Sequence, residues 1–189
     1  GIELKEFFRM RETVVFTFAF PVILLFVFGS VFSDELLPKY AVLDPELSMT
    51  APASIAASCG VDALIHAMVA YVSRNATPFS DAMAEKAMEL IGGHLRRFVA
   101  NRQDEEAACA MMLGSNFAGI SFAWARLGNV HAMSHPVSAY FNVPHGVANS
   151  ILLPNVVEYN ALADHGRYEV IYNYIREGSG PIENFTPDM

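Results

Sequence analysis

The chain has 189 residues, of which 53% are hydrophobic and 17% charged, and its formal net charge is −8. With 12 lysines and arginines against 20 acidic residues, it offers no basic surface of the kind that binds nucleic acid. Cys59 and Cys109 lie far apart and form no CxxC motif, which disfavours a disulfide and a cysteine-based metal site. Both cysteines are expected to be buried thiols in a reducing compartment.

The segment Val14–Phe32 (VVFTFAFPVILLFVFGSVF) is a run of 19 residues without a charge. At about 1.5 Å per residue it would form a helix of roughly 28 Å, which is long enough to cross a bilayer. A signal peptide and a buried core helix are the alternatives, and the acidic residues near the start of the chain argue against a signal peptide. Residues 1–35 are therefore predicted to form a transmembrane helix, with the N-terminus in the cytoplasm.

Residues 36–50 are predicted to be a linker, in which Lys39–Asp44 (KYAVLD) has the composition of a remnant strand. From residue 51 to residue 189, apolar residues recur at intervals of three and four, which predicts a mainly α fold. The first expected helix runs from near Pro52 to about Ser73 and is loosened at Ser58–Gly60. The second begins at a cap formed by Ser80 and Asp81. The others run from Glu105 to about Ala123, from Asn129 to Pro136, from Pro144 to about Leu162, and from Tyr168 to Glu177.

Histidines and one aspartate show the spacing of metal ligands. Asp62 and His66 are four residues apart among good helix formers, so both side chains should point from one helical face. His131 and His135 repeat this spacing, and His145 stands where a further helix is expected to begin. A single histidine is more often a surface or core residue than a ligand, but two such pairs in apolar surroundings favour a metal site. Imidazole and carboxylate ligands suit a divalent ion such as iron or zinc.

Two long runs carry a resemblance to a known family: KYAVLDPELSMTAPASIAASCGVDALIHAMVAYVSRNATPFSDAMA and LGNVHAMSHPVSAYFNVPHGVANSILLPNVVEYN. Both resemble iron-containing (group III) alcohol dehydrogenases, which include lactaldehyde reductase, propanediol dehydrogenase and butanol dehydrogenases. The likeness starts near residue 38 and implies the family's helical metal-binding domain, in incomplete form. By this resemblance Asp62, His66, His131 and His145 are the metal ligands, and His135 contacts substrate or cofactor and relays a proton.

The resemblance also implies iron(II), with zinc as the alternative, NAD or NADP as the cofactor, and a small alcohol or aldehyde as the substrate. The chain departs from the family at Val69, where glutamate is usual, and this removes a polar contact near the ligands. Asn155 replaces a frequent histidine that is not a ligand. Upstream of Ala51 there is no strand followed by a glycine-rich turn and a helix, as nucleotide binding requires. The chain alone is therefore expected to be inactive as a dehydrogenase, although it still binds metal.

The run LKEFFRMRETVVFTFAFPVILLFVFGSVF resembles the cytoplasmic lead-in and first membrane helix of ABC-type exporter permeases. This second resemblance covers residues from about 2 to 33 and implies that the chain joins pieces of two unrelated genes. The alternatives to a dehydrogenase fragment are a membrane-anchored metal-binding protein and a non-functional fusion. The dehydrogenase-like part is expected in the cytoplasm. The sequence leaves open whether the protein forms a homo-oligomer.

Overall fold

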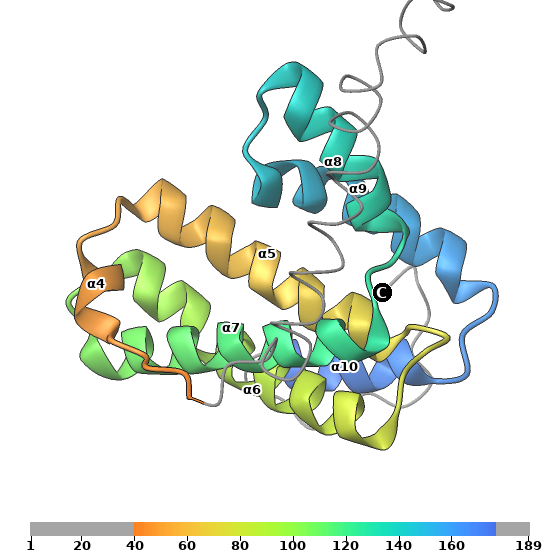
Figure 1. Ribbon diagram of the computed structural model, residues 1–189, viewed down its shortest axis with the longest axis horizontal. Helices are drawn as coiled ribbons and strands as arrows, with labels where there is room; N and C mark the ends of the chain where they lie inside the picture. Colours follow the sequence, from red (N-terminus) through yellow and green to blue (C-terminus); the bar gives the residue numbers. More distant parts are fainter. Residues whose placement is uncertain (1–39, 177–189) are drawn as a thin grey trace, which may run out of the picture. The chain divides into compact units, whose positions relative to one another are not determined.

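The computed structural model describes residues 40–176, and every regular element in this part is an α-helix (Figure 1). The mainly α prediction is confirmed for these residues. The predicted transmembrane helix Val14–Phe32 lies outside them. All the helices belong to one compact unit that begins at Leu43. They are α4 (Pro45–Met49), α5 (Ala53–Tyr71), α6 (Pro78–Ala100), α7 (Glu105–Ala125), α8 (Asn129–Phe141), α9 (His145–Ala161) and α10 (Arg167–Ile175).

Helix α5 is the central element of this unit. It packs against α6 and α7 on one side and against α9 on the other, and α8 packs on α9 (Figure 1). Helix α4 contacts α7, and α10 contacts α6. A helix that is covered on two sides has to be apolar around most of its circumference. Both α5 and α7 are long and apolar enough to cross a bilayer, but their packing in this core accounts for the same composition.

The core between α5, α6 and α7 is built largely from alanine and glycine, so the helix backbones approach closely. Gly60 of α5 faces the side chains of Leu95 and Met111, which leave no room for a Cβ. This packing also keeps α5 helical through Gly60, and the expected loosening at Ser58–Gly60 is wrong. The buried alanines of the core are Ala56, Ala63, Ala67, Ala84, Ala87, Ala107, Ala108 and Ala118.

The start of α6 and the residues before α4 differ from the expectation. Thr77, rather than Ser80, caps α6: its Oγ1 accepts a hydrogen bond from the Ser80 backbone N–H, and Ser80 Oγ accepts one from the Thr77 N–H. Residues 40–44 form no strand, because the described part of the chain contains no other strand with which they could pair. Instead, Asp44 caps α4 by accepting a hydrogen bond from the Glu46 N–H.

Helix α8 continues beyond Pro136, where it was expected to end, and reaches Phe141. A proline inside a helix removes one backbone hydrogen bond and leaves the carbonyl four residues earlier unpaired. That carbonyl belongs to Ala132, which is exposed together with Pro136, so water can bind there in place of the missing N–H.

The two cysteines are exposed, so the expectation of buried thiols is wrong. Cys109 lies on the face of α7 that is opposite to Met111 and Ala118, which belong to the core. Cys59 lines a shallow apolar pocket between α5 and α7 instead of filling the space between them. Cysteine is buried on average, but this preference does not determine whether one residue of a helix faces the core or solvent.

Helix α10 is tied to the core by Arg167. Its guanidinium makes two hydrogen bonds to the carboxylate of Asp81 on α6, at 2.8 and 3.1 Å, and a further one to the Tyr71 carbonyl of α5. The same group lies 4.5 Å from the centre of the Tyr71 ring. Burial of the ring, together with the nearby Glu85 carboxylate, raises the pKa of Tyr71 to about 12, so the phenol stays neutral beside these charges.

Helix α9 crosses α5 at Gly146. A Cβ at this position would overlap the carbonyl oxygen and the hydroxyl of Ser58 in α5. The missing side chain therefore lets the two backbones come into direct contact. This contact lies one residue after His145, so it determines where that histidine sits relative to α5.

We predict that Gly146→Ala lowers the free energy of unfolding by about 1–3 kcal/mol, because the new methyl group has to push α9 away from α5. The matched control is Gly119→Ala in α7, where a Cβ would meet no neighbour. That change should leave stability unchanged or raise it by up to about 1 kcal/mol through better helix propensity. Chemical denaturation followed by circular dichroism measures both. Equal stability of the two variants would contradict the close crossing.

Candidate metal centre

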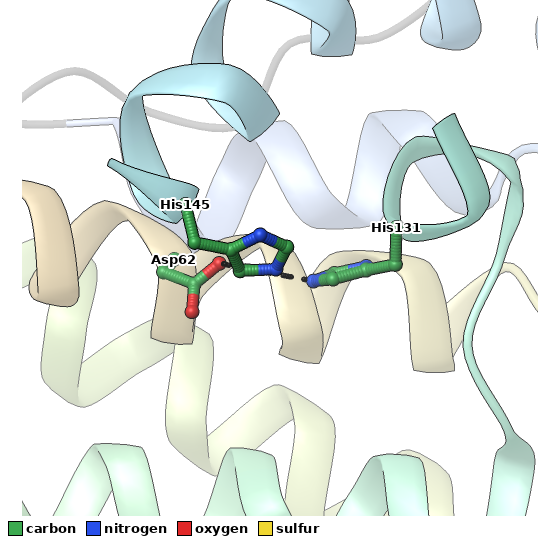
Figure 2. Close-up of side chains that lie close together, drawn as sticks. All are labelled: Asp62, His131 and His145. Carbon is green, nitrogen blue, oxygen red and sulfur yellow. Dashed lines mark ion pairs between the residues drawn. The ribbon is translucent and has the colours of Figure 1, made fainter. Parts of the chain in front are cut away.

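Three of the ligand-type side chains singled out from the sequence converge from three different helices. Asp62 lies in the middle of α5, His131 near the start of α8, and His145 is the first residue of α9. Figure 2 shows their side chains pointing toward one another. One ligand atom from each residue can be chosen so that all three lie within 4.8 Å of one another.

The carboxylate of Asp62 is shared among the surrounding imidazoles. Its Oδ1 lies 3.8 Å from Nε2 of His131 and 3.8 Å from Nε2 of His145. Its Oδ2 lies 3.4 Å from Nε2 of His66, one turn further along α5. The predicted chelating pair Asp62 and His66 therefore does share one helical face, and the other two histidines face the same carboxylate.

His66 lies on the side of the cluster that faces α7. Its ring stacks on the Phe122 ring of α7, with centroids 4.5 Å apart, and on the His131 ring, with centroids 4.2 Å apart. These contacts fix the plane of the imidazole. Sequence reasoning did not find Phe122, because nothing distinguishes it from the other apolar residues of α7 until the helices are packed.

His135 lies at the outer edge of the cluster. Its side chain is exposed, and its ring centroid is 5.1 Å from that of His145 and 6.2 Å from that of His131. Like His66, it does not belong to the group of close ligand atoms that Asp62, His131 and His145 form. Its place fits a residue that faces solvent or a bound molecule beside the ligands.

The centre is buried on one side and open on the other. The His131 side chain is fully buried, whereas 22% of Asp62 and 32% of His145 is exposed. Among the described residues, the buried side-chain atoms without a hydrogen-bond partner are Nδ1 of His66, both ring nitrogens of His131, and Oδ1 of Asn149. Burying a polar atom without a partner costs about 1–3 kcal/mol, so such a cluster calls for a specific cause.

The electrostatics favour an ionised Asp62 beside a neutral His131 imidazole. Burial alone would raise the pKa of Asp62, but the imidazoles of His131 and His66 and the amide of Asn149 outweigh it and hold that pKa well below its ordinary value. Burial lowers the pKa of His131, and the nearby Asp62 charge offsets this only in part. A negative carboxylate beside neutral ring nitrogens is the state in which these groups bind a cation.

Two further polar side chains contact the cluster and were not found from the sequence. Ser138 Oγ of α8 lies 3.3 Å from Nδ1 of His145, and Asn149 Nδ2 of α9 donates a hydrogen bond of 2.5 Å to Asp62 Oδ1. Asn149 follows His145 by one helical turn, a spacing that puts both on one face of α9. This spacing is the signal in the sequence that could have pointed to Asn149.

The wall behind His131 is apolar. Val69 of α5 is buried in a small cluster with Ile65, Val130 and Val156. A glutamate at position 69 would place a carboxylate in this apolar cluster.

These residues fit a divalent cation. The distance of 3.8 Å between His131 Nε2 and Asp62 Oδ1 is too long for a hydrogen bond. His131 Nε2 has no other partner, and Asp62 Oδ1 accepts its hydrogen bond from Asn149 rather than from a histidine. Two ligands that bind one ion at about 2.0–2.2 Å each lie no more than about 4.4 Å apart. The distances of 3.4 and 3.8 Å from Asp62 to the three imidazoles meet this limit, and the chosen atoms of Asp62, His131 and His145 lie within 4.8 Å of one another, which is close to it. Nitrogen and carboxylate ligands together suit iron(II) or zinc.

Comparison with known proteins identifies the class to which this helical domain belongs. The sequence profile described as "Fe-containing alcohol dehydrogenase family, C-terminal" matches residues 56–184. NAD-dependent methanol dehydrogenase of Bacillus methanolicus is 40% identical over 147 residues, and lactaldehyde reductase of Escherichia coli K12 is 46% identical over 125 residues. The chain belongs to the Fe-containing alcohol dehydrogenase family.

Solved structures agree in fold. The structure of 1,3-propanediol oxidoreductase has a TM-score of 0.69 at 41% identity and covers 71% of this chain. The structure of sulfoacetaldehyde reductase from Bifidobacterium kashiwanohense in complex with NAD+ has a TM-score of 0.69 at 33% identity and covers 74% of this chain. Each match covers only part of the relative's own chain.

The matches cover 78% and 66% of this chain but only 39% of the methanol dehydrogenase and 32% of the lactaldehyde reductase. For the two structures the matched share is 35% and 37% of the other chain. The chain thus spans well under half the length of the relatives that it matches, and the common part is the helical domain.

Proposed function

We propose that this chain provides the metal-binding part of a dehydrogenase that interconverts primary alcohols and aldehydes with NAD or NADP. Asp62, His66, His131 and His145 would hold the divalent ion, which is iron(II) or, with the same ligands, zinc. The observation that supports this most strongly is the buried His131, whose ring nitrogens have no partner although Nε2 faces the Asp62 carboxylate. A bound cation would satisfy that atom and the carboxylate together.

The ion, when bound, would polarise the substrate oxygen and lower the pKa of the alcohol. The chain's own residues would prepare the site for this. Ser138 would accept the Nδ1 proton of His145 and thereby leave Nε2 free as a ligand. Phe122 and the Val69 cluster would keep water away from the buried side of the histidines, while the exposed edges of Asp62 and His145 leave room for substrate.

His135 is proposed as the residue that moves the proton of the alcohol to solvent. Its imidazole is exposed and adjacent to His145, and histidine is the side chain best suited to exchange protons near neutral pH. It stands apart from the ligand atoms, so it can change its protonation state without leaving a metal.

The nicotinamide cofactor and the substrate class rest on the relatives. One relative is an NAD-dependent methanol dehydrogenase, another a lactaldehyde reductase, and one solved structure contains NAD+. We extend this to a small alcohol or aldehyde as substrate for the present chain. Cytoplasmic location of the helical domain, anchoring through Val14–Phe32 and self-association belong to the same proposal.

Metal content tests the proposal. We predict that the purified chain, loaded with iron(II) without oxygen, retains about one equivalent of iron, and that His145→Ala retains much less because a ligand is lost. His94→Ala in α6 is the matched control, since its imidazole contacts the Leu90 carbonyl of its own helix and takes no part in the cluster. Elemental analysis after desalting measures all three.

His135→Ala adds a second comparison in the same experiment. It should retain iron like the wild-type chain, because the exposed His135 imidazole, unlike that of His66, does not pair with the Asp62 carboxylate. Equal iron in wild type, His94→Ala and His145→Ala would contradict the proposed centre. Loss of iron in His135→Ala would show that the ligands have been assigned wrongly.

Turnover is predicted to need a nucleotide-binding domain besides these 189 residues. The sequence upstream of Ala51 contains no strand, glycine-rich turn and helix in succession, so the chain supplies no recognised binding site for the dinucleotide. We predict that the iron-loaded chain alone does not reduce NAD+ in the presence of 1,3-propanediol, as followed by the absorbance of reduced nicotinamide. Clear turnover that is lost in His145→Ala would contradict this prediction.

A further inference from the structure

We propose that Asn149 is a positioning residue that directs the Asp62 carboxylate toward the three histidines. This inference rests on the proposed metal centre and deepens it, because it explains how an acidic side chain from α5 is held in register with ligands on α8 and α9. No ligand role is assigned to Asn149 itself.

The contact is specific to one oxygen. Asn149 Nδ2 donates to Asp62 Oδ1 at 2.5 Å, and this same oxygen lies 3.8 Å from Nε2 of both His131 and His145. A carboxylate oxygen has two lone-pair directions, so one can accept the amide N–H while the other faces the imidazoles. The hydrogen bond thus restricts rotation of the carboxylate about its last torsion, which is otherwise a broad one.

The orientation of the amide follows from the chemistry of its partner. An ionised carboxylate only accepts hydrogen bonds, so the NH2 group of Asn149 has to face Asp62. Its Oδ1 is then left buried without a partner in a side chain that is fully buried. A residue selected for packing alone would not carry this unpaired oxygen, since an apolar side chain of similar size would avoid its cost.

The register of α9 makes this arrangement possible. Asn149 lies one helical turn after His145, and the crossing at Gly146 keeps this face of α9 against α5. Helix α9 therefore carries both a proposed ligand, His145, and the residue Asn149, which orients the ligand Asp62 on α5. A shift of α9 would move both together.

The test compares Asn149→Leu with Asn155→Leu. Leucine has the same branched arrangement of heavy atoms as asparagine but cannot donate, and Asn155 is an exposed residue of the same helix. Each protein is titrated with Co²⁺ alone, and its dissociation constant and visible absorption spectrum are measured. The thermal midpoint of the metal-free protein is recorded beside them. Asn149→Ser, whose hydroxyl is too short to reach Asp62, is the second variant should Asn149→Leu not fold.

We expect Asn149→Leu to raise the Co²⁺ dissociation constant about 10- to 100-fold, the usual effect of losing a group that orients a ligand. Its Co²⁺ spectrum should also change, while Asn155→Leu behaves as wild type. If Asn149 had a purely structural role, Asn149→Leu would instead lower the thermal midpoint and leave the Co²⁺ dissociation constant within about threefold of wild type. That result would overturn this inference but not the proposed metal centre. No Co²⁺ binding by the wild-type chain would overturn the proposed centre and this inference with it.

Discussion

The close crossing of α9 over α5 at Gly146 is the constraint on which the site depends. The two backbones meet there because Gly146 has no side chain, and the carbonyl of Ser58 lies where its Cβ would be. Helix α5 carries Asp62 and His66, and α9 starts at His145. Close contact of these helices therefore places one imidazole directly beside a carboxylate that is distant in sequence. Helix α8 packs on α9 and adds His131.

The resulting arrangement puts polar atoms where they cost stability. The ring nitrogens of His131 and the amide oxygen of Asn149 are buried without partners, and the Asp62 carboxylate is surrounded by imidazoles that are too far away for good hydrogen bonds. The alanine-rich core of α5, α6 and α7 and the Arg167 contacts with Asp81 provide stability elsewhere. This division between a well-packed core and an unsatisfied polar cluster is typical of a binding site.

Most of the helices were predictable from the sequence, whereas contacts between distant helices were not. The i, i+4 spacing of Asp62 and His66 indicates one helical face, and the structure places both on it. Spacing cannot reveal Phe122 or Ser138, because their roles arise only when α7 and α8 pack near the histidines. Local rules also failed at Gly60, where packing keeps α5 helical, and at Pro136, where α8 continues because the unpaired carbonyl lies on its exposed side.

X-ray absorption of the iron-loaded chain tests most directly whether Asp62 and the three histidines form one metal centre. We expect a first coordination shell of nitrogen and oxygen atoms at about 2.0–2.2 Å, with the outer-shell scattering of three imidazole rings. His145→Ala should reduce that scattering by one ring. A shell made only of oxygen atoms, or one that contains sulfur from the exposed Cys59 or Cys109, would contradict the account.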